Sequence, residues 1–98
     1  MFIYDDPIVE LLNKNDVHLI KDVTLETDFD DIKLYSHERW SGVRYYLREL
    51  KGYRTLNDLG ANIEIIVNDI RNLKMLRETS INTFVELLRA AYLYYGLR

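Results

Sequence analysis

The sequence contains no cysteine and no glutamine, a single proline and four isolated glycines. Without cysteine, the chain has no disulfide, no thiolate metal ligand and no cysteine nucleophile. Glycines that stand apart cannot form the glycine-rich loop that binds phosphate groups in nucleotide-binding proteins. No apolar run approaches the roughly 18 residues that a membrane span needs. We therefore expect neither a membrane protein nor a P-loop protein.

The 98 residues suffice for one domain with a modest core, and 48% hydrophobic with 30% charged residues is typical of a folded chain. We expect a single domain over residues 1–98. The first six residues are acidic rather than basic, which is unlike a secretory signal and favours an intracellular, cytoplasmic protein. The lack of glutamine is typical of heat-adapted proteins, whereas seven asparagines argue against such a source.

The net charge of −3 conceals an uneven distribution. Residues 1–31 hold nine acidic residues against two lysines, for a net charge of −7. Residues 32–54 hold six basic residues against two glutamates, for a net charge of +4. Charge asymmetry of this kind points to partners of opposite charge. Alternatively, the two segments face each other in the fold or are simply solvated.

The N-terminal third predicts a short helix followed by a β-hairpin. Asp6 is a favoured N-cap and Pro7 a favoured first helical residue, so we expect a helix that ends near residues 13–15. From Val17 to Phe29 apolar residues stand at odd positions, which is the period of a strand. Residues 28–31 are turn-like, and residues 32–34 alternate as a short return strand.

Residues 36–52 predict a second helix. Ser36 can cap it, Tyr35 can pack on Trp40, and Gly52 can end it. Its apolar residues are spaced 3, 4 and 3 apart, which gives one helical face: Trp40, Val43, Leu47 and Leu50.

The strongest helical pattern lies between residues 55 and 78. Thr55 and Asp58 fit a capping box, and Gly60 can permit a close helix contact. The apolar residues follow an uninterrupted heptad pattern: Leu56, Leu59, Ile63, Ile66, Ile70 and Leu73.

We expect Thr79 and Ser80 to end this helix and to cap a last one, which ends at Gly96. The apolar residues of this last helix again have heptad spacing: Ile81, Phe84, Leu88, Ala91 and Tyr95. Two such helices joined by a short turn fold back on each other. The predicted class is thus α+β and mostly helical: a short N-terminal helix, a β-hairpin and three amphipathic helices, the last two forming an antiparallel helical hairpin.

No set of residues forms a recognisable enzyme site. Neighbouring residues on a helix point apart, so Ser36 and His37 cannot act together, and we expect His37 at the surface or as a cap. The acidic residues 28–31 depart from the calcium-binding EF-hand pattern, since Ile32, Lys33 and Arg39 occupy ligand or glycine positions. We predict no catalytic residue, no metal ligand, no cofactor and no small-molecule substrate.

Basic residues form a stripe on the predicted second helix, beside its apolar face. Arginine and lysine neutralise phosphates, and nearby tyrosines can stack on bases. The candidate nucleic-acid-binding residues are Arg44, Arg48, Lys51 and Arg54. The acidic N-terminal third could instead cover this stripe.

The last helix carries more tyrosine and leucine than one buried face of a small core can hold. Tyrosine is favoured at interfaces because one end is apolar and the other polar. The candidate residues for an oligomer interface are Phe84, Leu88, Tyr92, Tyr94 and Tyr95. The alternative is that these aromatic side chains pack within the monomer.

Three functions follow from these features. The first is a non-enzymatic protein-interaction or assembly module, self-associating through its C-terminal helices, with itself or another protein as partner. The second is a nucleic-acid-binding regulator that uses the basic residues 44–54. The third is an acidic inhibitor or DNA mimic of the viral or mobile-element type, whose working face would consist of Asp22, Glu26, Asp28, Asp30 and Asp31.

Overall fold

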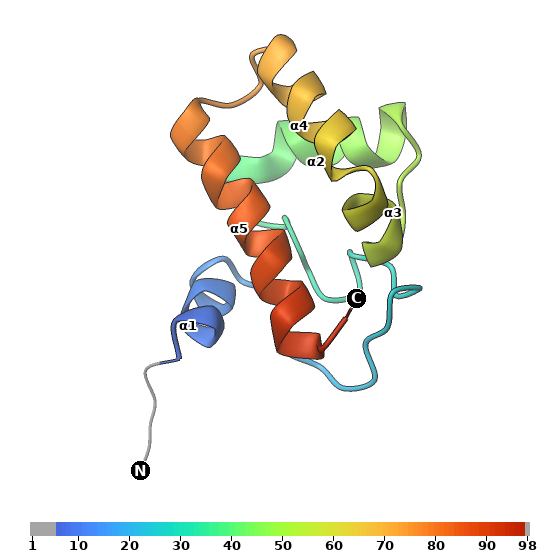
Figure 1. Cartoon of the computed structure of the whole chain (residues 1–98), viewed down its shortest axis with the longest axis vertical. Helices are drawn as coiled ribbons and strands as arrows, with labels where there is room; N and C mark the ends of the chain where they lie inside the picture. Colours follow the sequence, from blue (N-terminus) through green and yellow to red (C-terminus); the bar gives the residue numbers. More distant parts are fainter. Residues whose placement is uncertain (1–5, 98) are drawn as a thin grey trace.

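The computed structural model describes residues 6–97, and the regular secondary structure in this range is helical (Figure 1). The predicted absence of a secretory signal concerns residues 1–5 and lies outside the described residues. No helix in the described range combines the length and apolar character that crossing a bilayer requires. The elements in chain order are α1 (Pro7–Lys14), the 3-10 helix η1 (Glu38–Trp40), α2 (Ser41–Tyr45), the π-helix η2 (Tyr46–Leu50), α3 (Leu56–Ala61), α4 (Ile63–Asn72) and α5 (Glu78–Tyr95).

The predicted β-hairpin is absent from the described residues, so the α+β class is wrong and the fold is mostly helical. Residues 15–37 instead form successive turns and irregular backbone. Four non-glycine residues in this segment have left-handed backbone that a strand cannot contain: Asp16, Asp22, Lys33 and Tyr35. Two backbone hydrogen bonds join the two predicted strands, from the His18 amide to the Ile32 carbonyl at 2.7 Å and from the Leu34 amide to the Phe29 carbonyl at 3.0 Å, and they do not form a ladder.

Besides the turn hydrogen bonds within it, the irregular segment is hydrogen-bonded to the residues at the start of α3. The amide of Phe29 donates to the Arg54 carbonyl at 3.0 Å, and an isolated antiparallel bridge joins Asp28 to Thr55. The Leu56 amide also donates to the Thr27 carbonyl at 3.0 Å. The alternating apolar pattern therefore recorded burial, not a strand. The segment's buried apolar side chains are Val17, Val23, Phe29, Ile32, Leu34 and Tyr35.

The predicted N-terminal helix is confirmed as α1. The Asp6 carboxylate accepts a hydrogen bond from the Ile8 amide at 2.9 Å, and Pro7 occupies the first turn. Leu12 is fully buried and anchors α1 against α5. The Asn15 side chain donates to the Leu11 carbonyl and closes the helix near the expected position.

The predicted second helix is present but changes its hydrogen-bonding pattern on the way. His37, rather than Ser36, caps it, because its Nδ1 accepts from the Arg39 amide at 3.2 Å. At η2 the Lys51 amide donates to the Tyr46 carbonyl, which is the wider i→i+5 bond of a π-helix. The wider turn changes the angular spacing of the residues that follow, and Leu50 at its end is 63% exposed whereas Tyr46 at its start is buried.

The predicted heptad helix is broken at Asn62 into α3 and α4. The Thr55 and Asp58 capping box is confirmed, with both of its reciprocal hydrogen bonds formed. The Asn62 side chain donates to the Asp58 carbonyl at 2.8 Å and so competes with helical hydrogen bonding. Leu73 stands beyond the end of α4 and is 62% exposed, although it fits the heptad spacing.

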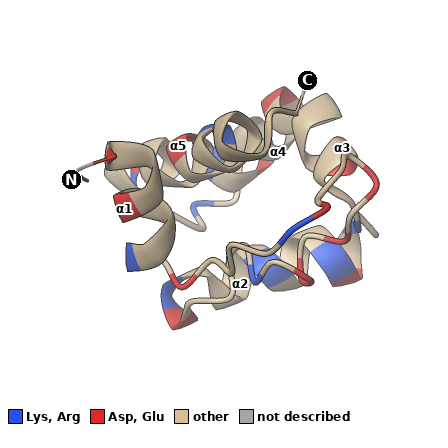
Figure 2. Ribbon diagram, turned by 90° about the horizontal axis from the view of Figure 1, so that it is seen from below, with Lys and Arg blue, Asp and Glu red and all other residues tan. Residues whose placement is uncertain are grey.

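The chain then reverses in residues 73–77, earlier than the expected break at Thr79 and Ser80, and α5 returns past α4 (Figure 1). Gly96 ends α5 in a left-handed conformation with φ 66°, as predicted. Figure 2 shows α1, α5 and α4 on one side of the molecule and α2, with the irregular segment, on the other.

A cluster of three aromatic rings joins these two sides. The ring of Tyr35 stacks on Phe84 of α5 with centroids 4.3 Å apart, and Trp40 meets both rings. The Tyr35 hydroxyl donates to the Phe84 carbonyl at 2.7 Å, so its polar end is satisfied although the residue is fully buried. Burial raises the pKa of Tyr35 well above its usual value, so the hydroxyl remains a donor.

Gly60 allows the close contact that the sequence suggested. A Cβ atom at this position would lie 2.8 Å from Cζ of Tyr92, which is closer than side chains approach. The Tyr92 hydroxyl also donates to the Leu56 carbonyl at 2.5 Å, which fixes the ring against α3. Glycine is therefore favoured here by the packing between α3 and α5, since a larger residue requires the Tyr92 ring to move.

Replacing Gly60 with alanine is expected to lower the free energy of unfolding by about 1–3 kcal/mol, because the tyrosine ring must move. Gly42→Ala is the matched control, since nothing lies within 4 Å of its added Cβ. Alanine is a better helix former, so this control is expected to be neutral or to gain up to about 1 kcal/mol. Urea denaturation of both variants measures the difference, and a stabilised Gly60→Ala variant would contradict the proposed contact.

Candidate functional site

The four predicted nucleic-acid-binding residues lie on α2, η2 and the loop that follows, and the structure places acidic residues against three of them. Arg48 is the most enclosed, with 14% of its side chain exposed. Its Nη1 lies 2.8 Å from Asp28 Oδ1 and its Nε lies 3.1 Å from Asp30 Oδ2. Its guanidinium also lies over the ring of Phe29, 5.1 Å from the centroid. The guanidinium is thus held by two carboxylates and one aromatic ring.

Arg44 completes this cluster from the preceding turn. Its Nε and Nη2 donate to Asp30 Oδ1 at 3.0 and 2.8 Å. Two arginines therefore meet two aspartates, and the four side chains are together neutral. The acidic and basic segments thus face each other in the fold, which is one of the alternatives that the charge distribution allowed. A phosphate group could contact these arginines fully only by displacing Asp28 and Asp30.

The protonation of Asp28 reflects this pairing. Partial burial by itself raises the pKa of a carboxyl group, but hydrogen bonds from Arg48 and the Asp30 amide, and the charges of Arg48 and Arg54, outweigh it. The pKa of Asp28 therefore lies below its ordinary value of 3.8. The same contact, led by the hydrogen bond to Asp28, raises the pKa of Arg48. Both groups are charged at neutral pH.

The remaining two basic residues lie further along the chain. The Lys51 amino group lies 3.8 Å from Asp69 on α4, and the hydroxyl of Tyr46 donates to the same carboxylate. Burial, together with this hydrogen bond, raises the pKa of Tyr46 far above its usual value. Arg54 is exposed, and its amide donates to Asp58 at 2.8 Å. Arg44 and Arg48 thus share one cluster with Asp28 and Asp30, whereas Lys51 pairs with Asp69 and Arg54 lies apart from both, so the four residues do not form one open cationic surface.

The predicted interface residues are mostly engaged within the monomer. Phe84 and Leu88 are buried, with 1% and 5% exposure. Tyr92 is held against α3, and the Tyr95 hydroxyl donates to the His18 carbonyl at 2.9 Å. Tyr94 is 42% exposed and meets the ring of Tyr95 edge-on. Of the five, Tyr94 is thus the residue most open to a partner.

A different face of α5 is open along its length. We call it the outer ridge, and it consists of residues spaced 4, 3 and 4 apart: Asn82, Glu86, Arg89 and Leu93. All four are exposed, and Leu93 is 60% exposed. Neither Glu86 nor Arg89 forms an ion pair with any residue that the structure describes. The spacing was visible in the sequence, but the mixed polarity of the ridge gave no apolar signal.

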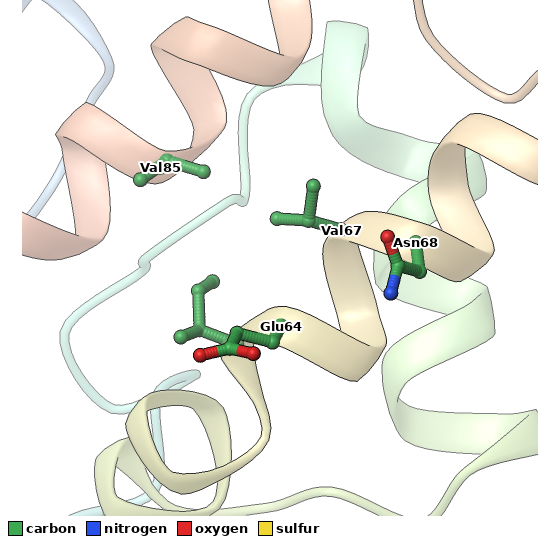
Figure 3. A pocket seen from close by; sticks show the side chains of 5 residues that line it. Glu64, Val67, Asn68 and Val85 are labelled. Carbon is green, nitrogen blue, oxygen red and sulfur yellow. The ribbon is translucent and has the colours of Figure 1, made fainter.

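Hollows lie on both sides of the outer ridge. The α4 hollow has a volume of about 320 Å³ and separates α4 from Val85 of α5, as Figure 3 shows. It is lined by Ile63, Glu64, Val67, Asn68 and Val85. A neighbouring hollow of about 270 Å³ extends it past Gly60 and Leu88 to Arg89 and Tyr92.

The α1 hollow lies on the opposite side and has a volume of about 170 Å³. Pro7, Ile8 and Leu11 of α1 form one wall. Residues of α5 form the other: Glu86, Arg89, Ala90 and Leu93. Arg89 and Leu93 therefore stand at the rim of apolar depressions, where a partner's side chains could be desolvated. The α4 and α5 helices splay apart at the α4 hollow, so the expected helical hairpin is not closely packed along its whole length.

The described residues contain no group of three or more histidine, cysteine or acidic side chains arranged to hold a metal ion. His37 acts as the helix cap described above, and His18 is exposed. The Trp40 indole nitrogen is buried without a hydrogen-bond partner in the described part of the chain, and it lies within the aromatic cluster.

The Arg48→Ala variant is expected to lose about 1.5–3 kcal/mol of unfolding free energy, because Asp28 and Asp30 are left partly buried without their cation. The control is Arg71→Ala, whose partner Glu78 is joined to it at 2.7 Å on an open surface, with side chains 47% and 63% exposed. Solvent screens that pair, so its removal is expected to matter much less. Equal losses in the two variants would show that the Arg48 cluster contributes no more than a surface pair.

Acid is expected to remove the contribution of Asp28. The pKa of Asp28 is lower in the folded chain than in the unfolded chain. The stabilisation that Asp28 contributes is therefore fully present above about pH 3.8 and is lost as the pH falls through the pKa of the folded state. Asp28→Asn keeps the acceptor for the Asp30 amide but removes the charge. We therefore expect Asp28→Asn to be less stable than the unmodified chain at about pH 7, and this difference in the free energy of unfolding to shrink towards about pH 2. Urea denaturation across this pH range measures the difference. In an Arg48→Ala background this pH dependence should be reduced, and an unchanged dependence would assign it to other groups.

Comparisons with known proteins add no relationship to this geometry. No protein-family model, curated protein or solved structure matches the chain.

Proposed function

We propose that this chain is a small, non-enzymatic, intracellular interaction module that self-associates through its C-terminal helix, α5. The observation that carries the proposal is the exposed outer ridge between two apolar hollows. Single exposed apolar residues are common on protein surfaces. Here, however, the exposed face of α5 and the apolar hollows on either side of it form one continuous surface, to which α1, α4 and α5 contribute. Concave apolar surface next to a protruding helix is the shape that helix–helix docking uses.

The position of α5 supports this role. Its opposite face supplies the buried residues Ile81, Phe84, Leu87 and Ala91, so the helix is held firmly by the core. A partner would therefore meet a preformed surface and lose little conformational entropy on binding. The outward residues Leu93 and Tyr94 provide apolar and aromatic surface near its C-terminal end, at 60% and 42% exposure.

The contacts of the basic residues favour self-association over nucleic-acid binding. Arg44 and Arg48 already make charge-assisted hydrogen bonds to Asp28 and Asp30. Counterion release depends on the net positive charge brought to the phosphates, and Asp28 and Asp30 already neutralise these two arginines, although the Arg44 side chain is 41% exposed. The acidic-inhibitor alternative loses Asp28 and Asp30 from its working face for the same reason.

Sedimentation across a concentration series tests the proposal, with the expected result that the native chain forms a dimer. Leu93→Glu places a charge at the rim of the α1 hollow and is expected to shift the protein to monomer without unfolding it. Leu50→Glu is the matched control, because Leu50 is similarly exposed at 63% but lies on η2, away from α5. A native chain that stays monomeric at every concentration, or a control that dissociates equally, would contradict the proposal.

A further inference from the structure

The outer ridge is complementary in charge to a second copy of itself. Glu86 and Arg89 occupy its centre, one turn apart, and both are exposed and free of ion pairs to other described residues. A two-fold axis that crosses α5 between them reverses the direction of the second helix. Glu86 of each copy then faces Arg89 of the other, and Asn82 faces Leu93.

This arrangement satisfies the symmetry of a closed dimer. In an isologous interface the same patch is used twice, so each contact must occur in both directions. A parallel arrangement would instead place Glu86 against Glu86 and Arg89 against Arg89, which is repulsive. The order of the two charges along α5 therefore selects the antiparallel arrangement.

The hollows beside the ridge fit the same geometry. Helices pack when the ridge of one enters the groove of the other, and here each ridge is bordered by a groove on both sides. In the antiparallel arrangement the Leu93 end of one helix lies beside the Asn82 end of the other, next to Val85 and the α4 hollow. Leu93 thus lies opposite Asn82 at the edge of this hollow, while the charges pair at the centre.

From this we infer that two copies of the chain dock through antiparallel α5 helices, joined by reciprocal ion pairs between Glu86 of one copy and Arg89 of the other. The inference rests on the proposed function and adds to it the direction of the helices and the residues that set their register. If an unrelated helical protein bound this surface instead, exchanging the charges at positions 86 and 89 would not restore binding.

Charge exchange between the two positions tests the inference in the full chain. Glu86→Arg leaves two positive charges at the centre of each helix, and Arg89→Glu leaves two negative charges. Like charges would then face each other across the axis, so each variant is expected to raise the dimer dissociation constant by about tenfold or more. An equimolar mixture of the two variants is expected to form a heterodimer, and the double variant Glu86→Arg/Arg89→Glu is expected to recover the homodimer.

Sedimentation equilibrium and native mass spectrometry of each variant and of the mixture measure these outcomes. Glu49→Arg, a charge reversal at an exposed position of η2, serves as the control and is expected to leave the dimer unchanged. If Leu93→Glu dissociates the dimer but neither charge variant does, self-association through α5 stands and the antiparallel register is overturned. If both single variants dissociate it and neither the mixture nor the double variant restores it, the reciprocal pairing is overturned as well. A monomeric native chain would overturn the proposed function first.

Discussion

The guanidinium of Arg48, held between Asp28 and Asp30 and over the ring of Phe29, ties the irregular segment to the helical part of the molecule. Residues 15–37 have no helix or sheet of their own, so their position depends on side-chain contacts and on backbone bonds to residues 54–57. Side-chain and backbone contacts meet at Asp28, because its carboxylate binds Arg48 and its backbone forms the bridge to Thr55. At this cluster the acidic N-terminal segment and the basic segment of the chain neutralise each other within the fold.

The aromatic cluster secures the other end of the same segment. Tyr35 is a bulky residue in left-handed backbone, which costs free energy, with φ at 65°. Stacking on Phe84 and the hydrogen bond to the Phe84 carbonyl offset this cost and connect the segment to α5. Because α5 is thereby fixed on its inner side by Tyr35, Leu12 and Tyr92, its opposite face is presented rigidly to the outside. The core and the proposed interface are two sides of one helix.

Several local features follow from the sequence alone, since each depends on residues a few positions apart. Asp6 and Pro7 start α1, Thr55 and Asp58 cap α3, and Gly96 ends α5. Gly60 marks a close contact between helices, although its partner Tyr92 lies 32 positions along the chain. The periodicity of apolar residues likewise identifies most of the buried side chains, including Trp40, Leu47, Ile66 and Phe84.

The tertiary structure decided what those patterns became. The alternating residues 17–34 suited a strand, but no local signal states that residues 25–29 bond to residues 54–57 while the rest of the segment closes into turns. The left-handed backbone of Tyr35 is likewise accompanied by contacts with Phe84, which lies 49 positions along the chain. Likewise, the basic residues were visible, but their neutralisation by Asp28 and Asp30 required chain segments 14 to 20 residues apart to meet. The sequence by itself determined the caps at Asp6 and Thr55, the end of α5 at Gly96 and the apolar periodicity, because these depend on sterics and hydrogen bonds between residues close in the chain. Three properties depend instead on which distant groups come together and exclude water from one another. They are whether a segment forms a strand or a turn, whether a charge is paired, and which face of a helix is buried. Only the folded chain decided them.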